Sequence, residues 1–369
     1  MTVDLTTHYL GLRLPSPLVV ASCPLTGEVY KLQQLEQAGA AAAVLPSLFE
    51  EQIRHEDALL ASVSRRSTDD AGENPSYVSG MDEYNAGPDS YLRHLEAAKR
   101  AVKMPIIASL NGFLTGDWTR FARLIQDTGA DALELNIYFL AVDPAMSGHD
   151  VEERYVDLVH EVRATVAIPL AVKIGPYFSS LPAMARRLVD AGANGLVLFN
   201  RFLQPDLDLN ALDLHPTIGL SHRNELQLRL RWVSILRGQL SVSLAATGGA
   251  HLAEDVVGLL LVGADVAMLA SALMRHGPRY LEKLLNEIAL WMEAKGFASV
   301  EGMKGIVSQR CADRLGANER RNYIASVTSL ARGAKPEAIE APLDFPVRDV
   351  KTPAELPEHP LSAEDEESR

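Results

Sequence analysis

The chain has 369 residues, of which 47% are hydrophobic and 22% are charged, and its formal net charge is −13. This composition is typical of a globular protein with enough chain for one large domain or two small ones. The negative charge argues against a nucleic-acid partner, because phosphate binding needs a concentrated basic face. No apolar run reaches the ~18 residues of a membrane span, and the start resembles no signal peptide. We therefore expect a cytoplasmic α/β protein of enzyme size, with no membrane partner.

The cysteine and histidine content excludes two further classes. Cys23 and Cys311 are the only cysteines, with no CxxC and no Cys/His cluster at zinc spacing. This pattern excludes a disulfide framework and a cysteine-held iron–sulfur cluster. His222 and His251 have no partner at ligand spacing, so we expect helix caps or phosphate neighbours and no metal site. Cys23 is expected to be a small buried thiol and Cys311 a structural residue.

Four segments share one local pattern, a Gly-Ala pair followed by a short apolar run. They read QAGAAAAVLP, DTGADALELN, DAGANGLVLFN and LVGADVAML. A glycine just past a helical pattern is typical of a helix C-cap, because glycine adopts the left-handed conformation without a Cβ penalty. The apolar run predicts a strand buried on both faces, as in a parallel sheet. Each segment is therefore half of a βα unit.

Extending this pattern along the chain predicts eight strands, each followed by a helix. The strands are Leu18–Ser22, Ala42–Leu45, Pro105–Leu110, Ala132–Asn136, Leu170–Ile174, Gly195–Asn200, Ser243–Thr247 and Val266–Ala270. The helices are Glu28–Ala38, Tyr91–Val102, Trp118–Asp127, Val151–Val166, Leu181–Ala191, Asn224–Leu236, Ala253–Leu261 and Arg279–Ala294. Eight strands, each followed by a helix, predict a (β/α)8 TIM barrel. A doubly wound sheet is the alternative, but the turn after the first strand reads ASCPLTG and carries no GxGxxG.

The barrel is expected to occupy residues 1–306 and to carry additions at both ends. The start, TTHYLGLRLPSPLVVAS, predicts a β-hairpin that caps the bottom of the barrel. Residues 307–335 have helical spacing with several arginines, and predict a helical C-terminal extension that covers the barrel or joins an oligomer interface. Residues 336–369 are acidic and Pro-rich, which predicts a tail that is disordered or draped over the surface. The long connections Pro46–Asp89 and Arg201–Arg223 leave from strand C-termini, where loops line the active site of a barrel.

The most specific local signal is TGGAHLAEDVVGLLLVGADVAMLASALM, which begins at Thr247. The seventh strand ends in Gly248-Gly249 and the eighth in Ala270-Ser271, and a helical pattern follows each pair. Small residues let backbone N–H groups approach an anion, and helix N-termini add positive dipole. Barrels frequently bind a phosphate between these two loops. We therefore predict a phosphate site here, the alternative being tight packing that needs small residues.

Polar residues of other strands converge on the same rim, namely Ser22, Asn136, Lys173 and Asn200. A lysine within the apolar strand AVKIG is costly to bury without an anionic partner. That partner is either a ligand or Glu134 on the neighbouring strand.

These motifs together resemble the dihydroorotate dehydrogenase family, mainly its class 1 enzymes. The resemblance runs from about residue 3 to 306 through ASCPLT, ELN, PLAVKIGPYF, FN and the TGG…ASALM segment, and continues into GPRYLEKLLNEIALWMEAKGFASVEGMKG. It implies a (β/α)8 barrel that holds one FMN at its C-terminal mouth and oxidises a CH–CH bond to C=C.

The resemblance also implies roles for single residues. Ala21 and Ser22 would lie against the isoalloxazine ring, with Ser47 beside it, and Asn136 and Asn200 would contact flavin or substrate. Lys173 would stabilise negative charge on reduced FMN, a role that suits a fixed cation. The phosphate would be held by Gly248, Gly249, Ala270 and Ser271.

On the substrate side the sequence departs from the family pattern. Pro46 stands in place of the lysine of the T-K-S motif, and Phe139 occupies the position of the base in N-L-S-C-P-N. The N-S-M-G-L-P-N stretch is replaced by Ser79–Asn85, and Arg201 replaces the serine after the sixth-strand asparagine, as an uncertain substrate contact. Tyr138 or a residue of the Pro46–Asp89 loop could stand in as the base.

Three hypotheses follow from this pattern. The first is an FMN-dependent oxidoreductase that acts on the CH–CH bond of a small molecule other than dihydroorotate. The second is a genuine dihydroorotate dehydrogenase of pyrimidine biosynthesis with an unusual base. The third is a non-catalytic flavoprotein or electron-transfer subunit. A homodimer and an electron-transfer partner protein are the expected assemblies.

Overall fold

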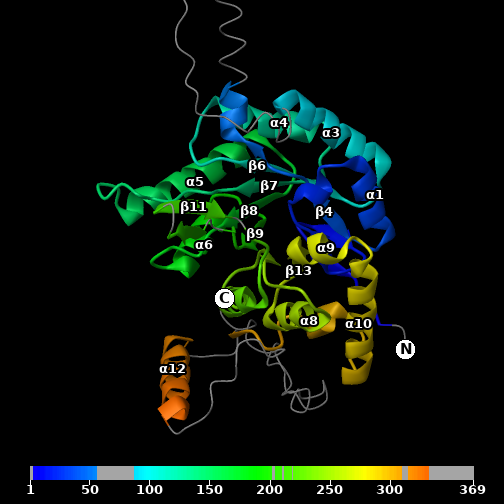
Figure 1. Cartoon of the computed structure of the whole chain (residues 1–369), viewed down its shortest axis with the longest axis vertical. Coiled ribbons are helices and arrows are strands. Elements are labelled where there is room, and N and C mark those ends of the chain that lie inside the picture. Colours follow the sequence, from blue (N-terminus) through cyan, green and yellow to red (C-terminus); the bar gives the residue numbers. More distant parts are fainter. Residues whose placement is uncertain are drawn as a thin grey trace, which may run out of the picture.

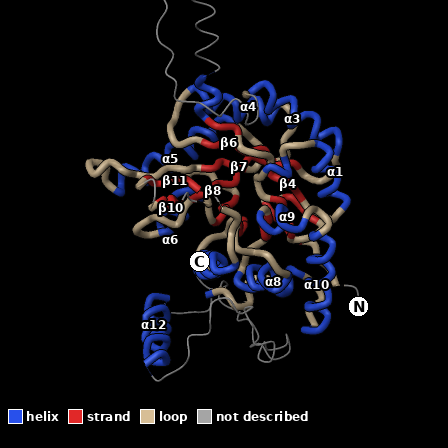
Figure 2. Tube along the Cα trace, viewed as in Figure 1, coloured by secondary structure: helices blue, strands red, loops and turns tan. Residues whose placement is uncertain are grey.

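The computed structural model describes residues 3–55, 87–201, 204–209, 212–217, 219–309 and 315–331. Eight parallel strands pair side by side in a closed ring, which Figure 2 shows surrounded by helices. In ring order the strands are β3 (Leu18–Val20), β4 (Ala42–Val44), β6 (Ile106–Asn111), β7 (Ala132–Asn136), β8 (Leu170–Ile174), β9 (Gly195–Leu198), β12 (Ser243–Thr247) and β13 (Val266–Leu269). The pairing of β13 with β3 closes the ring. The predicted (β/α)8 barrel is confirmed.

The outer layer consists of helices that alternate with the strands (Figure 1). They are α1 (Val29–Gln37), α3 (Pro88–Ala101), α4 (Arg120–Asp127), α5 (Gly148–Thr165), α6 (Leu181–Asp190), α7 (Leu226–Arg237), α8 (Ala253–Val262) and α10 (Tyr280–Lys295). Four of these helices, α1, α4, α6 and α8, are followed by the predicted glycines, which all have positive φ: Gly39, Gly129, Gly192 and Gly263. Gly263 follows α8 with φ of 114°, and a Cβ there would lie 2.4 Å from Cγ of Arg237. Both the backbone and the packing therefore require glycine at this turn.

Further helical elements are the 3-10 turns η1 (Pro24–Thr26), η2 (Asp117–Thr119) and η3 (Arg223–Glu225), and the helices α9 (Ser271–His276), α11 (Val300–Met303) and α12 (Leu315–Ala331). α12 stands apart from the barrel helices in Figure 1. Its Glu319 lies 3.8 Å from Arg231 of α7. None of the helices in the described ranges is long and apolar enough to cross a membrane.

The hydrophobic core has two parts, one on each side of the strand ring. The larger part packs the outward side chains of the strands against the helices. The smaller part fills the barrel with side chains of modest size, such as Ala42, Ala171 and Ala245. The N-terminal hairpin, β1 (Thr7–Tyr9) and β2 (Leu12–Leu14), adds Tyr9 and Leu14 to this inner part. The predicted hairpin at the base of the barrel is confirmed.

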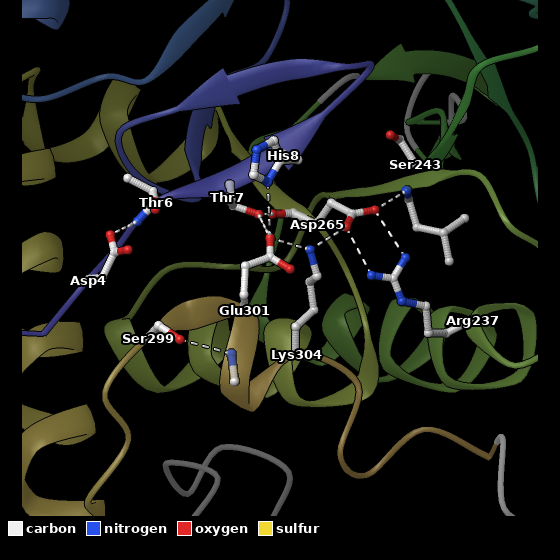
Figure 3. A network of polar contacts seen from close by, with 12 residues as sticks. Asp4, Thr6, Thr7, His8, Arg237, Ser243, Asp265, Ser299, Glu301 and Lys304 are labelled. Carbon is white, nitrogen blue, oxygen red and sulfur yellow. Dashed lines mark hydrogen bonds and ion pairs between the residues drawn. The ribbon is translucent and has the colours of Figure 1, made fainter. Parts of the chain in front are cut away.

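An acidic residue ties the hairpin to the barrel (Figure 3). The carboxylate of Asp265 lies 2.9 Å from Nη2 of Arg237 and 2.8 Å from Nζ of Lys304. It also accepts the N–H of Leu244 at 2.8 Å, while its backbone carbonyl accepts the hydroxyl of Thr7 at 3.0 Å. Asp265 therefore joins the hairpin, α7 and the segment after α10 at the end of the barrel opposite the predicted site.

The differences from prediction lie at the ends of strands and helices and in the long connections; α5, for example, begins at Gly148 and not at Val151. Ser22, Asn200 and Ala270 were predicted inside strands, but each follows the last paired residue of its strand. The sequence also gave no signal for β5 (Leu48–Phe49), which pairs with β6, or for the antiparallel hairpin β10 (Gln204–Asp208) and β11 (Asp213–Thr217). Most of the Pro46–Asp89 connection, including Ser79–Asn85, lies outside the described residues, as do Cys311 and the predicted tail 336–369.

Candidate active site

A cavity of about 120 Å³ opens at the C-terminal ends of the strands. It brings together seven of the residues predicted from the sequence, namely Ala21, Ser22, Lys173, Arg201, Gly248, Ala270 and Ser271. Its other lining residues are Phe199, Ser221, Arg229, Thr247, Ala250 and Met268. The ends of five strands, β3, β8, β9, β12 and β13, converge on this cavity because all strand C-termini of a parallel barrel meet at the same end.

A second cavity of about 430 Å³ adjoins the first. The two cavities share Phe199, Arg201 and Arg229, and the second is also lined by Asn200 and by Tyr177. Its volume falls in the range of small-molecule sites, whereas the first cavity has room for a group such as a phosphate. The rim thus offers a small polar compartment beside a larger one.

Two successive glycines at the end of β12, Gly248 and Gly249, form a tightly packed turn, called here the glycine cradle. Gly248 and Gly249 have φ of 88° and 89°, which favours glycine at both positions. A Cβ on Gly248 would lie 2.9 Å from Nη2 of Arg229, and one on Gly249 would lie 2.5 Å from the backbone nitrogen of Leu226. Neither position has room for a side chain, so the segment after β12 presents backbone alone.

Ser221, which the sequence analysis did not single out, joins the two loops of the predicted phosphate site. Its hydroxyl accepts the N–H of Gly249 at 3.3 Å, and its own N–H donates to Oγ of Ser271 at 2.9 Å. The hydroxyl also lies 3.2 Å from Nε2 of His251. Burial and the charge of Arg275 lower the pKa of His251 below its ordinary 6.5. The connection after β9 therefore packs directly onto the β12 and β13 loops.

Lys173 and Asn136 lie on adjacent strands at the same level of the barrel. Nζ of Lys173 is 3.5 Å from Oε1 of Glu134, whose side chain is 1% exposed. The sequence left open whether Lys173 faces a ligand or Glu134, and it both pairs with Glu134 and lines the cavity. Oδ1 of Asn136 is buried without a hydrogen-bond partner in the described part of the chain. An orphaned buried acceptor at a strand end is a place where a ligand donor fits.

Asn200 and Ser47 are held by protein groups. Nδ2 of Asn200 donates to the carbonyl of Ile137 at 2.8 Å, which orients the side chain at the edge of the second cavity. Oγ of Ser47 lies 2.8 Å from Oγ of Ser109 in a buried pair near β5 and β6.

Arg201 and Arg229 share one carboxylate. Nη1 of Arg201 lies 2.8 Å and 2.9 Å from the two oxygens of Glu225, whereas Nη2 of Arg229 lies 3.8 Å from Oε2. Burial raises the pKa of Glu225, but hydrogen bonds from Arg201 and the His222 N–H, with both arginine charges, outweigh it and hold the pKa below its ordinary 4.5. Arg229 itself is 5% exposed, and burial lowers its pKa.

Phe139, at the position where the family pattern has its base, is part of an aromatic stack. Its ring centroid lies 5.3 Å from that of Phe113 at an interplanar angle of 16°. The guanidinium of Arg154 lies 5.5 Å from the Phe139 centroid. Tyr138 precedes it and is half-buried. This part of the rim is therefore built by apolar and cationic groups.

Arg229 is the residue that sequence reasoning should have found. In α7 the buried residues Leu226, Arg229 and Val233 follow helical core spacing, so an arginine stands where an apolar residue is expected. Ser221 gave no such signal, because the connection that contains it has no periodic pattern.

The fold defines a class, the (β/α)8 barrels, whose functional sites lie at the C-terminal ends of the strands. Comparison with known proteins gives the family. The family model for dihydroorotate dehydrogenase matches residues 66–292, more than half of the chain. The chain belongs to the dihydroorotate dehydrogenase family and is an oxidoreductase of that flavin-dependent type, which acts on CH–CH donors.

Three curated relatives align with this chain over nearly their whole length. The dihydroorotate dehydrogenase B (NAD(+)) catalytic subunit of Thermoplasma acidophilum is 26% identical over 314 residues, 82% of this chain and 98% of the relative. The subunit of the same name from Listeria monocytogenes is 27% identical over 304 residues, covering 80% and 95%. The putative dihydroorotate dehydrogenase A (fumarate) of Aeropyrum pernix is 26% identical over 313 residues, covering 82% and 97%.

The residues at the rim fit a flavin mononucleotide. Gly248 lines the first cavity and has no side chain of its own, so its backbone can approach a phosphate there. The orphaned Oδ1 of Asn136 suits a ligand N–H, and Lys173 suits a group that gains negative charge. Among the described residues there is no cluster of three His, Cys, Asp or Glu side chains placed to hold a metal.

Proposed function

We propose that this chain is an FMN-dependent oxidoreductase that acts on a CH–CH bond of a small molecule other than dihydroorotate. One observation carries the proposal: Lys173 and Gly248 line one cavity at the end of the barrel, and the orphaned amide oxygen of Asn136 lies opposite Lys173 on the adjacent strand. FMN, when bound, supplies a two-electron acceptor for hydride.

The residues of this chain then have distinct roles. Gly248, Gly249, Ala270 and Ser271 hold the phosphate, and Ala21, Ser22 and Ser47 flank the ring. Asn136, Asn200 and Arg201 position ring or substrate, each at its place on the rim described above. Lys173 stabilises negative charge, which in a buried site is worth more than in water. Tyr138 is the candidate for accepting the substrate proton.

The change of substrate is supported by what stands at the position of the base. A CH–CH oxidation needs a base within hydrogen-bond reach of the substrate proton. Phe139 has no proton acceptor, and its ring stacks on Phe113. Arg201, where the family pattern has a serine, is held by Glu225 at the edge of the second cavity. Base and substrate contact have both changed, so a changed substrate is the simpler explanation.

A genuine dihydroorotate dehydrogenase of pyrimidine biosynthesis is the second candidate. The relatives favour it, because this chain covers 98% of a Thermoplasma acidophilum protein that is named as a dihydroorotate dehydrogenase catalytic subunit. In that case Tyr138 would serve as the base.

Partners follow from the same relatives. Several are named as catalytic subunits, which supports an electron-transfer partner protein for this chain as well. A homodimer and a location in the cytoplasm remain the predictions made from the sequence.

The cofactor is tested by identifying the chromophore. Purified protein, reconstituted with a mixture of FMN and FAD if colourless, is denatured, and the released flavin is separated by chromatography. We expect FMN alone. Release of FAD, or of no flavin at all after reconstitution, would contradict the proposal.

A further inference from the structure

We propose that Arg229 of α7 binds the FMN phosphate directly, as the side-chain ligand that accompanies the backbone cradle at Gly248. The inference rests on the proposed function and adds to it a residue that neither the sequence motifs nor the family resemblance pointed to.

The first argument is position. Nε of Arg229 donates to the carbonyl of Thr247 at 2.9 Å, and Nη1 donates to the carbonyl of Glu225 at 2.9 Å. These two bonds fix the plane of the guanidinium beneath the end of β12. The remaining nitrogen, Nη2, lies where a Cβ of Gly248 would be only 2.9 Å away. The guanidinium thus lies against the glycine cradle and lines the same cavity as Ser271.

The second argument is charge. Three cationic side chains line the cavity, and two of them have a close carboxylate: Glu134 for Lys173 and Glu225 for Arg201. Arg229 has only the more distant oxygen of that same Glu225, at 3.8 Å. No other carboxylate of the described residues lies within 4.0 Å of it. The group Arg201–Glu225–Arg229 therefore carries a surplus positive charge.

A buried charge is costly unless it is paired. Arg229 is 5% exposed, and its Nη2 donates no hydrogen bond to the described residues. A phosphate in the cradle would supply both the missing charge and the missing acceptor. Arginine suits this task because its planar fork matches phosphate geometry.

The test compares FMN with riboflavin, which has the same ring and lacks the phosphate. The full-length protein is stripped of flavin, and each ligand is titrated while flavin fluorescence is followed. If Arg229 contacts the phosphate, Arg229→Gln weakens FMN binding about 10- to 100-fold, the range for a charge-assisted hydrogen bond, and leaves riboflavin binding unchanged. Arg229→Lys keeps the positive charge but not the planar guanidinium, so it should lose less FMN affinity than Arg229→Gln.

The matched control is Arg231→Gln, which makes the same change two residues along the same helix at a side chain 62% exposed. It should leave both affinities unchanged. Equal losses of FMN and riboflavin binding in Arg229→Gln would overturn the proposal and assign Arg229 a structural role. A wild-type protein that binds neither flavin would instead contradict the proposed function.

A second measurement does not depend on a variant that folds. In a crystal structure of the wild-type protein with FMN, a guanidinium nitrogen of Arg229 should lie within about 3.2 Å of a phosphate oxygen. A phosphate held by backbone N–H groups with Arg229 turned away would refute the inference while leaving the flavin site intact.

Discussion

The ammonium group of Lys173 lies 3.5 Å from the carboxylate of Glu134 on the neighbouring strand, inside the barrel. Glu134 is almost fully buried, and Lys173 is 11% exposed and lines the cavity. One lysine therefore compensates a buried carboxylate and also faces the position proposed for the flavin. These two roles can be separated by experiment.

Lys173→Met leaves Glu134 buried without its partner. Removal of one member of a buried ion pair typically costs about 3–5 kcal/mol. We expect a loss of this size in the free energy of unfolding, measured in urea, together with a lower flavin reduction potential. The double variant Lys173→Met/Glu134→Gln should recover most of the stability but not the potential. Recovery of both would show that Lys173 has only the structural role.

Glu225 makes stability depend on pH in the acid range. Its folded pKa lies below the ordinary 4.5, so its contribution is present above that value and is lost as the pH falls through the lowered folded pKa. The melting temperature of the wild type should therefore fall more steeply below about pH 4.5 than that of Glu225→Gln. Glu282→Gln, an exposed change on α10, serves as the control and should follow the wild type. If the melting temperatures of the wild type and Glu225→Gln fell in parallel with pH, the lowered pKa of Glu225 would be contradicted.

Asp265 is predicted to matter for stability and not for the site. Asp265→Asn leaves Arg237 and Lys304 without their shared carboxylate, while the backbone bond to Thr7 of the hairpin is kept. We expect a loss of about 3–5 kcal/mol in the free energy of unfolding. FMN affinity should not change, because this network lies at the opposite end of the barrel. Asp157→Asn, at an exposed position on α5, is the matched control. An FMN affinity that falls with Asp265→Asn would refute this separation.

The sequence predicted the barrel because its signal repeats. Each Gly-Ala turn is a local feature that needs only its own helix and strand, and three strands, Ala132–Asn136, Leu170–Ile174 and Ser243–Thr247, match the structure at both ends. Strand ends then converge by topology alone, which is why Lys173 and Gly248 were placed on one rim.

The rest of the site depends on contacts between segments that have no common pattern. The bond from Gly249 to Ser221 depends on how the connection after β9 folds back, and that connection has no periodicity. Arg229 was visible as a charge at a core position of α7, but only the fold shows that the core position borders a cavity.

The substrate proposal is tested most directly by mixing the oxidised holoprotein with excess dihydroorotate without oxygen and following the visible absorbance of the flavin. Loss of a positioned base commonly costs ~10²–10⁴-fold in rate. We therefore expect slow or absent bleaching, with full reduction by dithionite in the same cuvette. Rapid and complete bleaching at neutral pH would contradict the proposal and identify the chain as a dihydroorotate dehydrogenase that works without the usual base.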